Sequence, residues 1–168
     1  MDILTIGEVL IDLTQTGKDE RGIPQFAANP GGAPANVLTA MTRLGCQTGF
    51  IGKVGDDMHG HLLKDTLDNC GIDTRGLVVD PTVFTTLAFV ALKNGERSFS
   101  FARKPGADTQ LRPEELLKEQ LTDTRIFHFG SLSLTDSPAK EATMEALKVA
   151  KEAGALISYD PNYRSAVA

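Results

Sequence analysis

The chain of 168 residues has no tryptophan, no run of basic residues and no long apolar segment. A net charge of −5 without any basic patch argues against a nucleic-acid surface, so we exclude that function class. The longest apolar run, Leu87 to Leu92, is far too short to span a bilayer. The N-terminus begins in a strand-like run without a basic segment before it, so we expect a cytoplasmic protein with no membrane partner.

Signatures of metal and nucleotide sites are also missing. Cys46 and Cys70 have no C-x-x-C spacing, which favours structural thiols in a reducing compartment over a disulfide or a zinc site. His59 and His61 lie two positions apart on an expected helix and therefore point in nearly opposite directions, which argues against a shared metal. No P-loop and no G-x-G-x-x-G occurs, and we expect no metal ligands in this chain.

What the sequence does contain is an alternation of strand, turn and helix. Its length, with 41% hydrophobic and 23% charged residues, suits one globular domain. Such alternation favours an α/β fold with a mainly parallel sheet. The segments that we expect to be regular are strands at 3–7 (continuing to Asp12), 48–54, 77–79, 126–130 and 155–159, and helices at 34–44, 58–70, 114–120 and 138–153.

The most distinctive stretch runs from Pro30 to Val37, with sequence PGGAPANV. Pro34 suits the first turn of a helix, and Gly31 and Gly32 allow the backbone to approach a ligand closely. Free N–H groups at such a helix start, together with the amide of Asn36, would suit an anionic or hydroxyl-rich ligand. On propensity alone, Gly-Gly before a helix can also be only a turn.

Asp12 is the first carboxylate that follows the N-terminal apolar run, which only Glu8 interrupts. In open α/β sheets ligands bind beyond the carboxyl ends of the strands, so we consider Asp12 a candidate for hydrogen bonding to a substrate. The alternative is a capping or turn aspartate.

Two segments interrupt the alternation of strands and helices. Residues 14–29 are polar and punctuated by glycine, and we interpret them as a flap. Residues 83–103 contain two strand-like runs around Asn94-Gly95, a typical hairpin turn, and we expect a lid or a dimer surface, or else an added antiparallel edge. Arg103 follows and could orient a polar substrate, although a basic loop residue can also be merely solvated.

With these features in place, the chain resembles the N-terminal half of ribokinase-like (PfkB) sugar kinases, and among them most closely fructokinases. The resemblance extends from Met1 to about Arg164. The motifs that carry it are Ile6-Gly7-Glu8 with Asp12, the 30–37 stretch, Phe50 to Asp57 with Gly60, Lys104 to Asp108, Phe127 to Ser131, and Ser158 to Arg164.

The resemblance implies a three-layer α/β sandwich with a small β lid, formed here by segments 14–29 and 83–103 of one domain, 1–168. It implies roles for individual residues as well. The sugar would be bound by Asp12, Gly31, Gly32, Asn36, Asp56, Phe101 and Arg103, and the transferred phosphate would face Asn162 and Arg164.

The resemblance further implies ATP-dependent, Mg²⁺-requiring phosphorylation of a small sugar, with fructose expected. Family members carry an Asn-x-x-Glu and a Gly-Ala-Gly-Asp with the catalytic base in their C-terminal half, and this sequence has neither. We therefore expect this chain alone to be inactive. Three hypotheses stay open: half of a kinase, a non-catalytic sugar-binding or regulatory fragment, and a chain that forms a homodimer through the lid or associates with a separate C-terminal half.

Overall fold

The computed structural model describes residues 1–93 and 96–162. A five-stranded parallel sheet forms its centre, with strand order β5-β4-β1-β8-β9. The strands are β1 (Ile3–Ile6), β4 (Thr48–Gly55), β5 (Asp73–Asp80), β8 (Ile126–Gly130) and β9 (Leu156–Asp160). Because β1 is the middle strand, its side chains are buried on both faces of the sheet.

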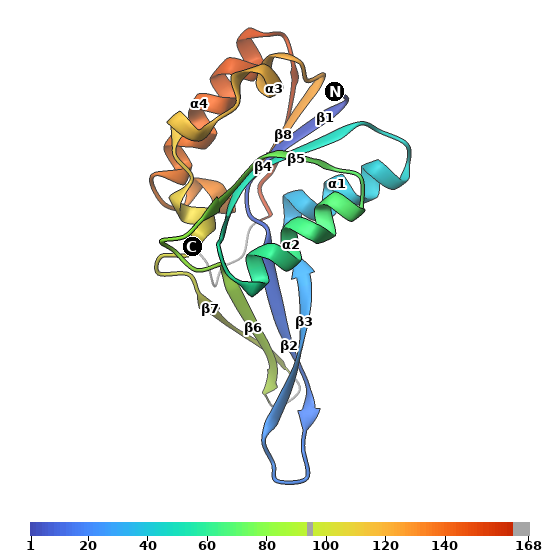
Figure 1. Cartoon of the computed structure of the whole chain (residues 1–168), viewed down its shortest axis with the longest axis vertical. Coiled ribbons are helices and arrows are strands. Elements are labelled where there is room, and N and C mark those ends of the chain that lie inside the picture. The colour runs from blue at the N-terminus through green and yellow to red at the C-terminus, as the bar shows by residue number, and fades with distance from the viewer. Residues whose placement is uncertain (94–95, 163–168) are drawn as a thin grey trace.

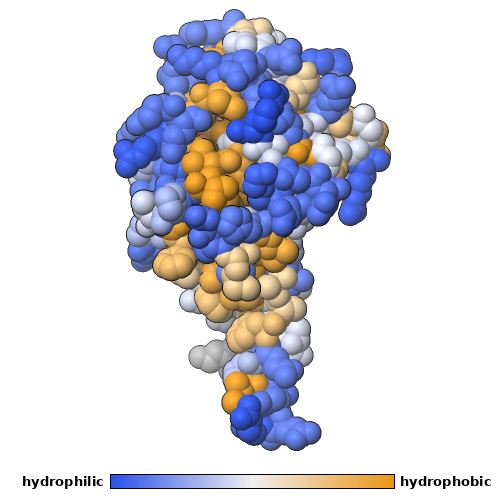
Figure 2. All heavy atoms as spheres, in the orientation of Figure 1, coloured by the Kyte–Doolittle hydropathy of each residue, from blue (hydrophilic) through white to orange (hydrophobic). Residues whose placement is uncertain are grey.

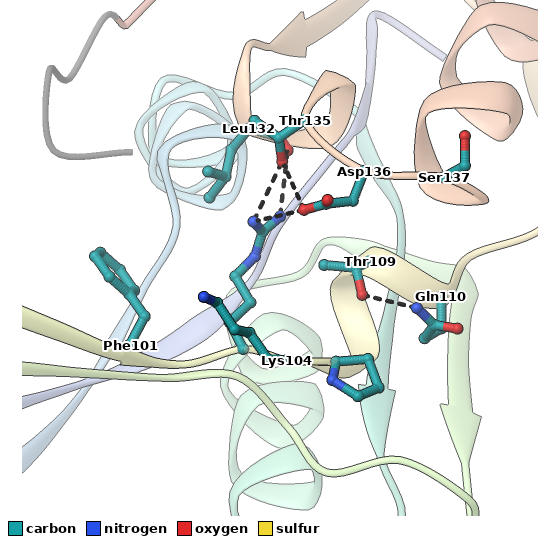
Figure 3. Close-up of a pocket in the computed structure, with 10 residues that line it drawn as sticks. Phe101, Lys104, Thr109, Gln110, Leu132, Thr135, Asp136 and Ser137 are labelled. Carbon is teal, nitrogen blue, oxygen red and sulfur yellow. Dashed lines mark hydrogen bonds and ion pairs between the residues drawn. The ribbon is translucent and has the colours of Figure 1, made fainter. Parts of the chain in front are cut away.

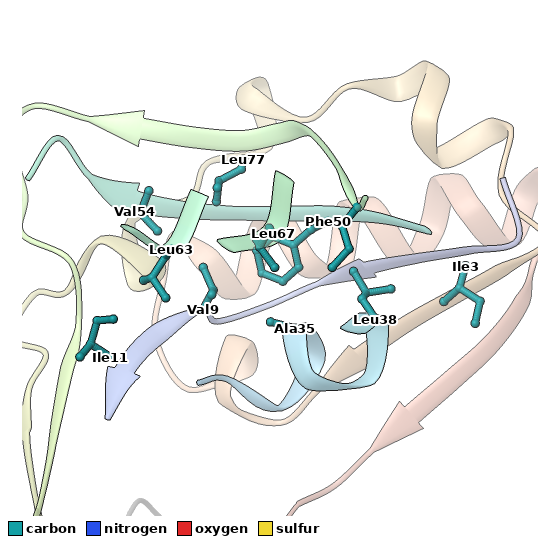
Figure 4. Close-up of a cluster of buried hydrophobic side chains, with 11 residues drawn as sticks. Ile3, Val9, Ile11, Ala35, Leu38, Phe50, Val54, Leu63, Leu67 and Leu77 are labelled. Atoms are coloured by element: carbon teal, nitrogen blue, oxygen red, sulfur yellow. The ribbon is translucent and has the colours of Figure 1, made fainter. Parts of the chain in front are cut away.

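Helices cover the two faces of this sheet and complete a three-layer arrangement (Figure 1). On one face lie α1 (Ala33–Arg43) and α2 (Met58–Asn69), which bury Leu38, Leu63 and Leu67 against β4 (Figure 4). On the other face lie α3 (Lys118–Thr122) and α4 (Ala139–Glu152), with short 3₁₀ turns at Ala107–Gln110, Pro113–Glu115 and Leu132–Leu134. The predicted α/β sandwich with a mainly parallel sheet is confirmed.

A second, four-stranded sheet projects from one end of this core (Figure 1). It contains β2 (Leu10–Lys18), β3 (Pro24–Gly31), β6 (Leu87–Lys93) and β7 (Glu96–Ala102) in the order β3-β2-β6-β7, and we call it the lid sheet. The expected hairpin is confirmed as the antiparallel pair β6 and β7, while its turn at 94–95 lies outside the described residues. The segments predicted as a lid therefore form most of one sheet.

The N-terminal apolar run was predicted as one strand ending at Asp12, and this is wrong. The chain leaves the central sheet after Ile6 and enters the lid sheet at Leu10, so Asp12 lies within a strand of the lid sheet. The break falls at Gly7, where a Cβ atom would lie 2.6 Å from Cγ of Pro34. The chain changes sheets where it passes the start of α1.

The helix predicted over 114–120 is also wrong, because the segment splits into a 3₁₀ turn and the short α3. Leu116 and Leu117 between them have extended backbones, and Leu116 is buried in the core beneath α4. The carboxylate of Glu115 accepts hydrogen bonds from the backbone N–H of Arg112 (2.7 Å) and from Nζ of Lys53 (2.7 Å). These tertiary contacts outweigh the local helix propensity.

The surface carries apolar side chains mainly over the middle of the molecule and the base of the lid sheet, whereas the far end of the β2–β3 hairpin is largely hydrophilic (Figure 2). Exposed aromatic residues include Phe26, Phe84 and Phe99. Within the part of the chain that the structure describes, no helix is both long and apolar enough to cross a membrane.

We predict that Leu63→Ala destabilises the fold by about 2–5 kcal/mol, because Leu63 is fully buried in the cluster between the central sheet and α2 and its truncation leaves a cavity there. Leu62 is its matched control, since the neighbouring side chain is 42% exposed and its truncation should cost less than about 1 kcal/mol. Urea denaturation of both variants checks this, and equal losses would contradict the packing described.

Candidate functional site

A cavity of about 460 Å³ lies where the central sheet meets the lid sheet. Its walls include residues just beyond the carboxyl ends of three neighbouring strands, namely Glu8 after β1, Ser131 after β8 and Asn162 after β9. From β1 the chain continues to β4 and β5 on one side of the sheet, and it later returns to β8 and β9 on the other side of β1. The strand order therefore reverses between β1 and β8, next to the cavity. Ligands bind at such a switch point in open α/β sheets.

The start of α1 forms a second wall through Gly32, Ala33 and Asn36. Gly32 precedes the helix with φ of +115°, and a Cβ atom there would collide with the carbonyl oxygen of Glu8. Gly31 is similarly constrained, because a Cβ atom would collide with the carboxylate of Asp12, although Gly31 does not itself line this cavity. The two glycines therefore let the chain before α1 approach the backbone of Glu8 and the carboxylate of Asp12 closely.

The lid sheet contributes a row of side chains on one face. Asp12 of β2 pairs with Ala88 of β6, which in turn pairs with Phe101 of β7, so the three side chains lie side by side across the sheet. Asp12 and Phe101 line the cavity, and Ala88 between them is small and buried. Partial burial raises the pKa of Asp12 above its ordinary value. The ring of Phe101 and the carboxylate of Asp12 therefore line the same cavity.

Glu8 is a buried carboxylate that the residue-by-residue predictions did not include. It is 5% exposed, and its Oε1 accepts a hydrogen bond from the backbone N–H of Ala33 at 3.0 Å. Burial raises the pKa of Glu8 to about 7, with a contribution from the negative charge of Asp108, and the hydrogen bond from Ala33 only partly offsets this. Since Gly32 has no side chain to cap α1, Glu8 performs that role from another part of the chain.

Arg103 lies in the wall of an adjoining cavity, which shares Phe101, Leu132 and Thr135 with the first one (Figure 3). Its guanidinium group donates to Asp108 at 2.8 Å, to the carbonyl oxygen of Leu132 at 3.2 Å and to the hydroxyl of Thr135 at 3.3 Å. The side chain is 10% exposed. Arg103 thus connects the end of β7 to the loop after β8, and a role in orienting a sugar stays a prediction.

The other predicted residues have different outcomes. Asn162 lines the cavity, with a left-handed backbone (φ 33°) and an N–H that donates to Asp160 at 2.9 Å. Asp56 follows β4 and lies outside the residues that line the cavity, with its carboxylate 2.8 Å from Nε2 of His61. Arg164 lies outside the described residues. Asp12, Gly32, Asn36, Phe101 and Asn162 are therefore the predicted residues that the structure brings together.

Several lining residues carried little signal in the sequence. Tyr159 was expected only as the last residue of a strand, and Thr135 lies outside every expected element and motif. Glu8 is different, because a lone charged residue that interrupts a buried apolar run already suggests a special contact. That signal could have identified Glu8 as a site residue.

The described residues offer no ligand set for a metal ion. Within 1–93 and 96–162, no group of three or more histidine, cysteine, aspartate or glutamate side chains is placed to hold one. Asp108 of the Gly-Ala-Asp segment has a buried carboxylate that binds Arg103 and the hydroxyl of Thr86. We therefore derive no catalytic step through magnesium or a nucleotide from these residues.

Comparison with protein families matches the whole of residues 1–168 to the model described as pfkB family carbohydrate kinase. The chain belongs to this family. Among curated relatives, this chain is 49% identical over 165 residues to the probable fructokinase-3 of Arabidopsis thaliana and 48% identical to fructokinase-2 of Solanum lycopersicum, covering 96% of this chain in both cases. It spans about half the length of these relatives, 48% and 50%.

Solved structures agree with this assignment. The fructokinase of Xylella fastidiosa superposes with a TM-score of 0.94 at 43% identity, covering 99% of this chain and 52% of that one. A structure of fructokinase from the same organism with bound ATP gives a TM-score of 0.92, with 99% and 50% covered. The described fold is thus the first half of a carbohydrate-kinase fold.

We predict that Gly32→Ala destabilises this kinase fold by roughly 2–4 kcal/mol, because the new Cβ atom combines a left-handed backbone with a collision against Glu8. Gly22→Ala is the matched control. Gly22 also has a positive φ, of 81°, but its Cβ atom would meet nothing within 4 Å, so only about 1 kcal/mol should be lost. Thermal unfolding distinguishes the two, and a similar cost at both positions would contradict the close approach at Gly32.

The raised pKa of Glu8 predicts a pH-dependent stability. The folded chain binds the proton of the Glu8 carboxyl group more tightly than the unfolded chain does. Protonation of Glu8 therefore stabilises the fold fully below pH 4.5, and this stabilisation is lost as the pH rises towards 7. The free energy of unfolding of the wild type should therefore fall relative to that of Glu8→Gln as the pH rises, by up to about 3 kcal/mol across this range. Urea denaturation at several pH values measures it, with exposed Glu141→Gln as control; a flat difference would contradict the burial of an ionisable Glu8.

Proposed function

We propose that this chain is the sugar-binding half of an ATP-dependent, Mg²⁺-requiring sugar kinase, and that its substrate is fructose. The observation that carries the proposal is the cavity at the switch point of a pfkB-family fold, where Asp12, Asn36 and the start of α1 meet. Several relatives named fructokinase share 47–49% identity with it, which supports fructose over other sugars.

The residues of the cavity suit a polyol. The carboxylate of Asp12 accepts hydrogen bonds from hydroxyl groups, and the amide of Asn36 can both donate and accept. Phe101 closes one side of the cavity with an apolar surface, against which the C–H face of a sugar can pack. Asn162, and Arg164 with it, would face the phosphate that is transferred, where an amide and a cation stabilise the developing charge.

The chemical step needs groups that this sequence does not contain. Neither the Asn-x-x-Glu nor the Gly-Ala-Gly-Asp of the family occurs in it, so the proposed role of these 168 residues is to bind and orient the sugar. We propose that transfer requires a C-terminal half, either in the same protein or as a partner. Exposed Phe26 and Phe99 on the lid sheet would also allow a homodimer through that sheet.

Because the reaction consumes ATP and the cysteines of this chain are free, we propose a reducing, cytoplasmic location. A second candidate function is a non-catalytic sugar-binding or regulatory fragment. The same cavity supports it, because the lining residues Asp12 and Asn36 can hydrogen-bond a sugar without a nucleotide. The two functions differ in whether addition of a C-terminal half confers phosphorylation.

We predict that the purified 168-residue chain binds fructose but does not phosphorylate it with ATP and Mg²⁺. Calorimetry measures the binding and a coupled assay measures turnover, after an intact mass has identified the sample. Asp12→Asn should weaken fructose binding by about 10-fold or more, because a hydrogen bond to a charged acceptor is lost.

Asp65→Asn on the exposed surface of α2 is the matched control and should leave the affinity unchanged. A folded wild-type chain that binds no fructose would refute the proposed substrate. Detectable turnover by the verified 168-residue chain would refute the requirement for a second half.

A further inference from the structure

Glu8 combines three properties that its role as a helix cap does not explain. It lines the same cavity as Asp12, its side chain is almost fully buried, and it carries two oxygens of which only one has a partner. Oε1 accepts from Ala33, whereas Oε2 has no hydrogen-bond partner among the described residues. A buried oxygen of this kind costs free energy unless something in the cavity satisfies it.

The charges around Glu8 do not supply that partner. Asp108, from the 3₁₀ turn at Ala107–Gln110, repels its negative form, and Asp12 lines the same cavity. The positive charge of Arg103 lowers the pKa of Glu8, but its guanidinium group is held by Asp108 and, at 3.6 Å, by Asp136. Among residues 1–93 and 96–162, no ion pair includes Glu8. Oε2 of Glu8 is therefore a buried acceptor without a hydrogen-bond partner among the described residues, on a side chain that lines the cavity.

A neutral hydrogen-bond donor suits this oxygen better than an anion. An anion would meet Glu8 and Asp12 together, and capping α1 needs only the one oxygen that Ala33 already occupies. A hydroxyl group donates to a carboxylate without bringing a charge into the cavity. The second oxygen of Glu8 is thus matched to a polyol.

We propose that Glu8 is a sugar-binding residue, whose Oε2 accepts a hydrogen bond from a hydroxyl other than the one held by Asp12. This inference rests on the proposed sugar-binding function and deepens it, since two carboxylates that line one cavity would accept hydrogen bonds from two hydroxyls of one sugar. It also couples binding to the fold, because the other oxygen of the same carboxylate fixes the first N–H of α1 beside Asn36.

The acceptor role has a pH consequence. Without sugar the pKa of Glu8 is about 7, so a hydroxyl that favours the carboxylate form lowers this pKa and displaces a proton. Fructose binding by the wild-type chain at pH 7 should therefore release a fraction of a proton, and affinity should fall as the pH is lowered from 8 to 6. Calorimetry in buffers of different ionisation enthalpy measures this without any variant.

Glu8→Gln is the sharpest variant, because its amide oxygen can still accept from Ala33 while an NH₂ group replaces the acceptor Oε2. We expect fructose affinity at pH 8 to fall 10-fold or more, and proton release at pH 7 to disappear. Asp12→Asn should lower affinity but retain the proton release. A panel of monodeoxy-fructoses then locates the contact: the analogue lacking the hydroxyl bound by Glu8 should bind wild type and Glu8→Gln equally.

The outcomes separate this inference from the function on which it rests. If wild type binds fructose, and Glu8→Gln binds it equally well at every pH, Glu8 only caps the helix and the inference fails while the proposed function stands. Proton uptake on binding by the wild type would refute the acceptor role. If the folded wild type binds no fructose, both the proposed function and the inference fail.

Discussion

The structure depends on one tight junction, where the chain leaves the central sheet and passes the start of α1. Gly7 packs against the ring of Pro34, Gly32 packs against the carbonyl of Glu8, and the carboxylate of Glu8 holds the N–H of Ala33. Side chains larger than hydrogen at either glycine would separate these segments. Since β1 belongs to one sheet and β2 to the other, this junction fixes the position of the lid sheet relative to the core.

A second set of polar contacts holds the opposite side of the cavity. Arg103 at the end of β7 bonds to Leu132 and Thr135 in the loop after β8, and Asp108 anchors its guanidinium group. The lid sheet is therefore attached to the central sheet through both β2 and β7. Hydrogen bonds to a buried charge are stronger than neutral ones, so these contacts attach this wall of the cavity firmly to the central sheet.

The features that could be predicted from sequence are those with local causes. An aspartate just before the apolar stripe of a helix is a typical cap, which makes Asp56 and Asp57 the candidates for α2; Asp57 is the cap and accepts from the N–H groups of His59 and Gly60. Asn94-Gly95 is likewise a local signal, because this dipeptide favours a tight hairpin turn, and it predicts the pair β6 and β7. Asp12 and Asn36 were identified through the motifs around them.

What could not be predicted depends on which distant segments meet. An apolar run continues from Ile3 to Ile11 although the sheet changes within it, because burial in either sheet demands the same residue types. The extended backbone at Leu116 likewise follows from the core beneath α4 and from Lys53, 62 residues away from Glu115 in sequence. The environments of Glu8 and Arg103 are set in the same way, by partners that no local pattern reveals.

The edge strand β9 links the cavity to the open side of the central sheet. Leu156 and Ile157 of this strand are 71% and 39% exposed, which is unusual for a parallel strand, whose faces are normally covered. Tyr159 of the same strand lines the cavity and stacks on Phe129 with ring centroids 4.9 Å apart. A chain that covers β9 would therefore reach the cavity wall as well, so the contacts that cover this edge and those that complete the proposed sugar site would come from the same segment.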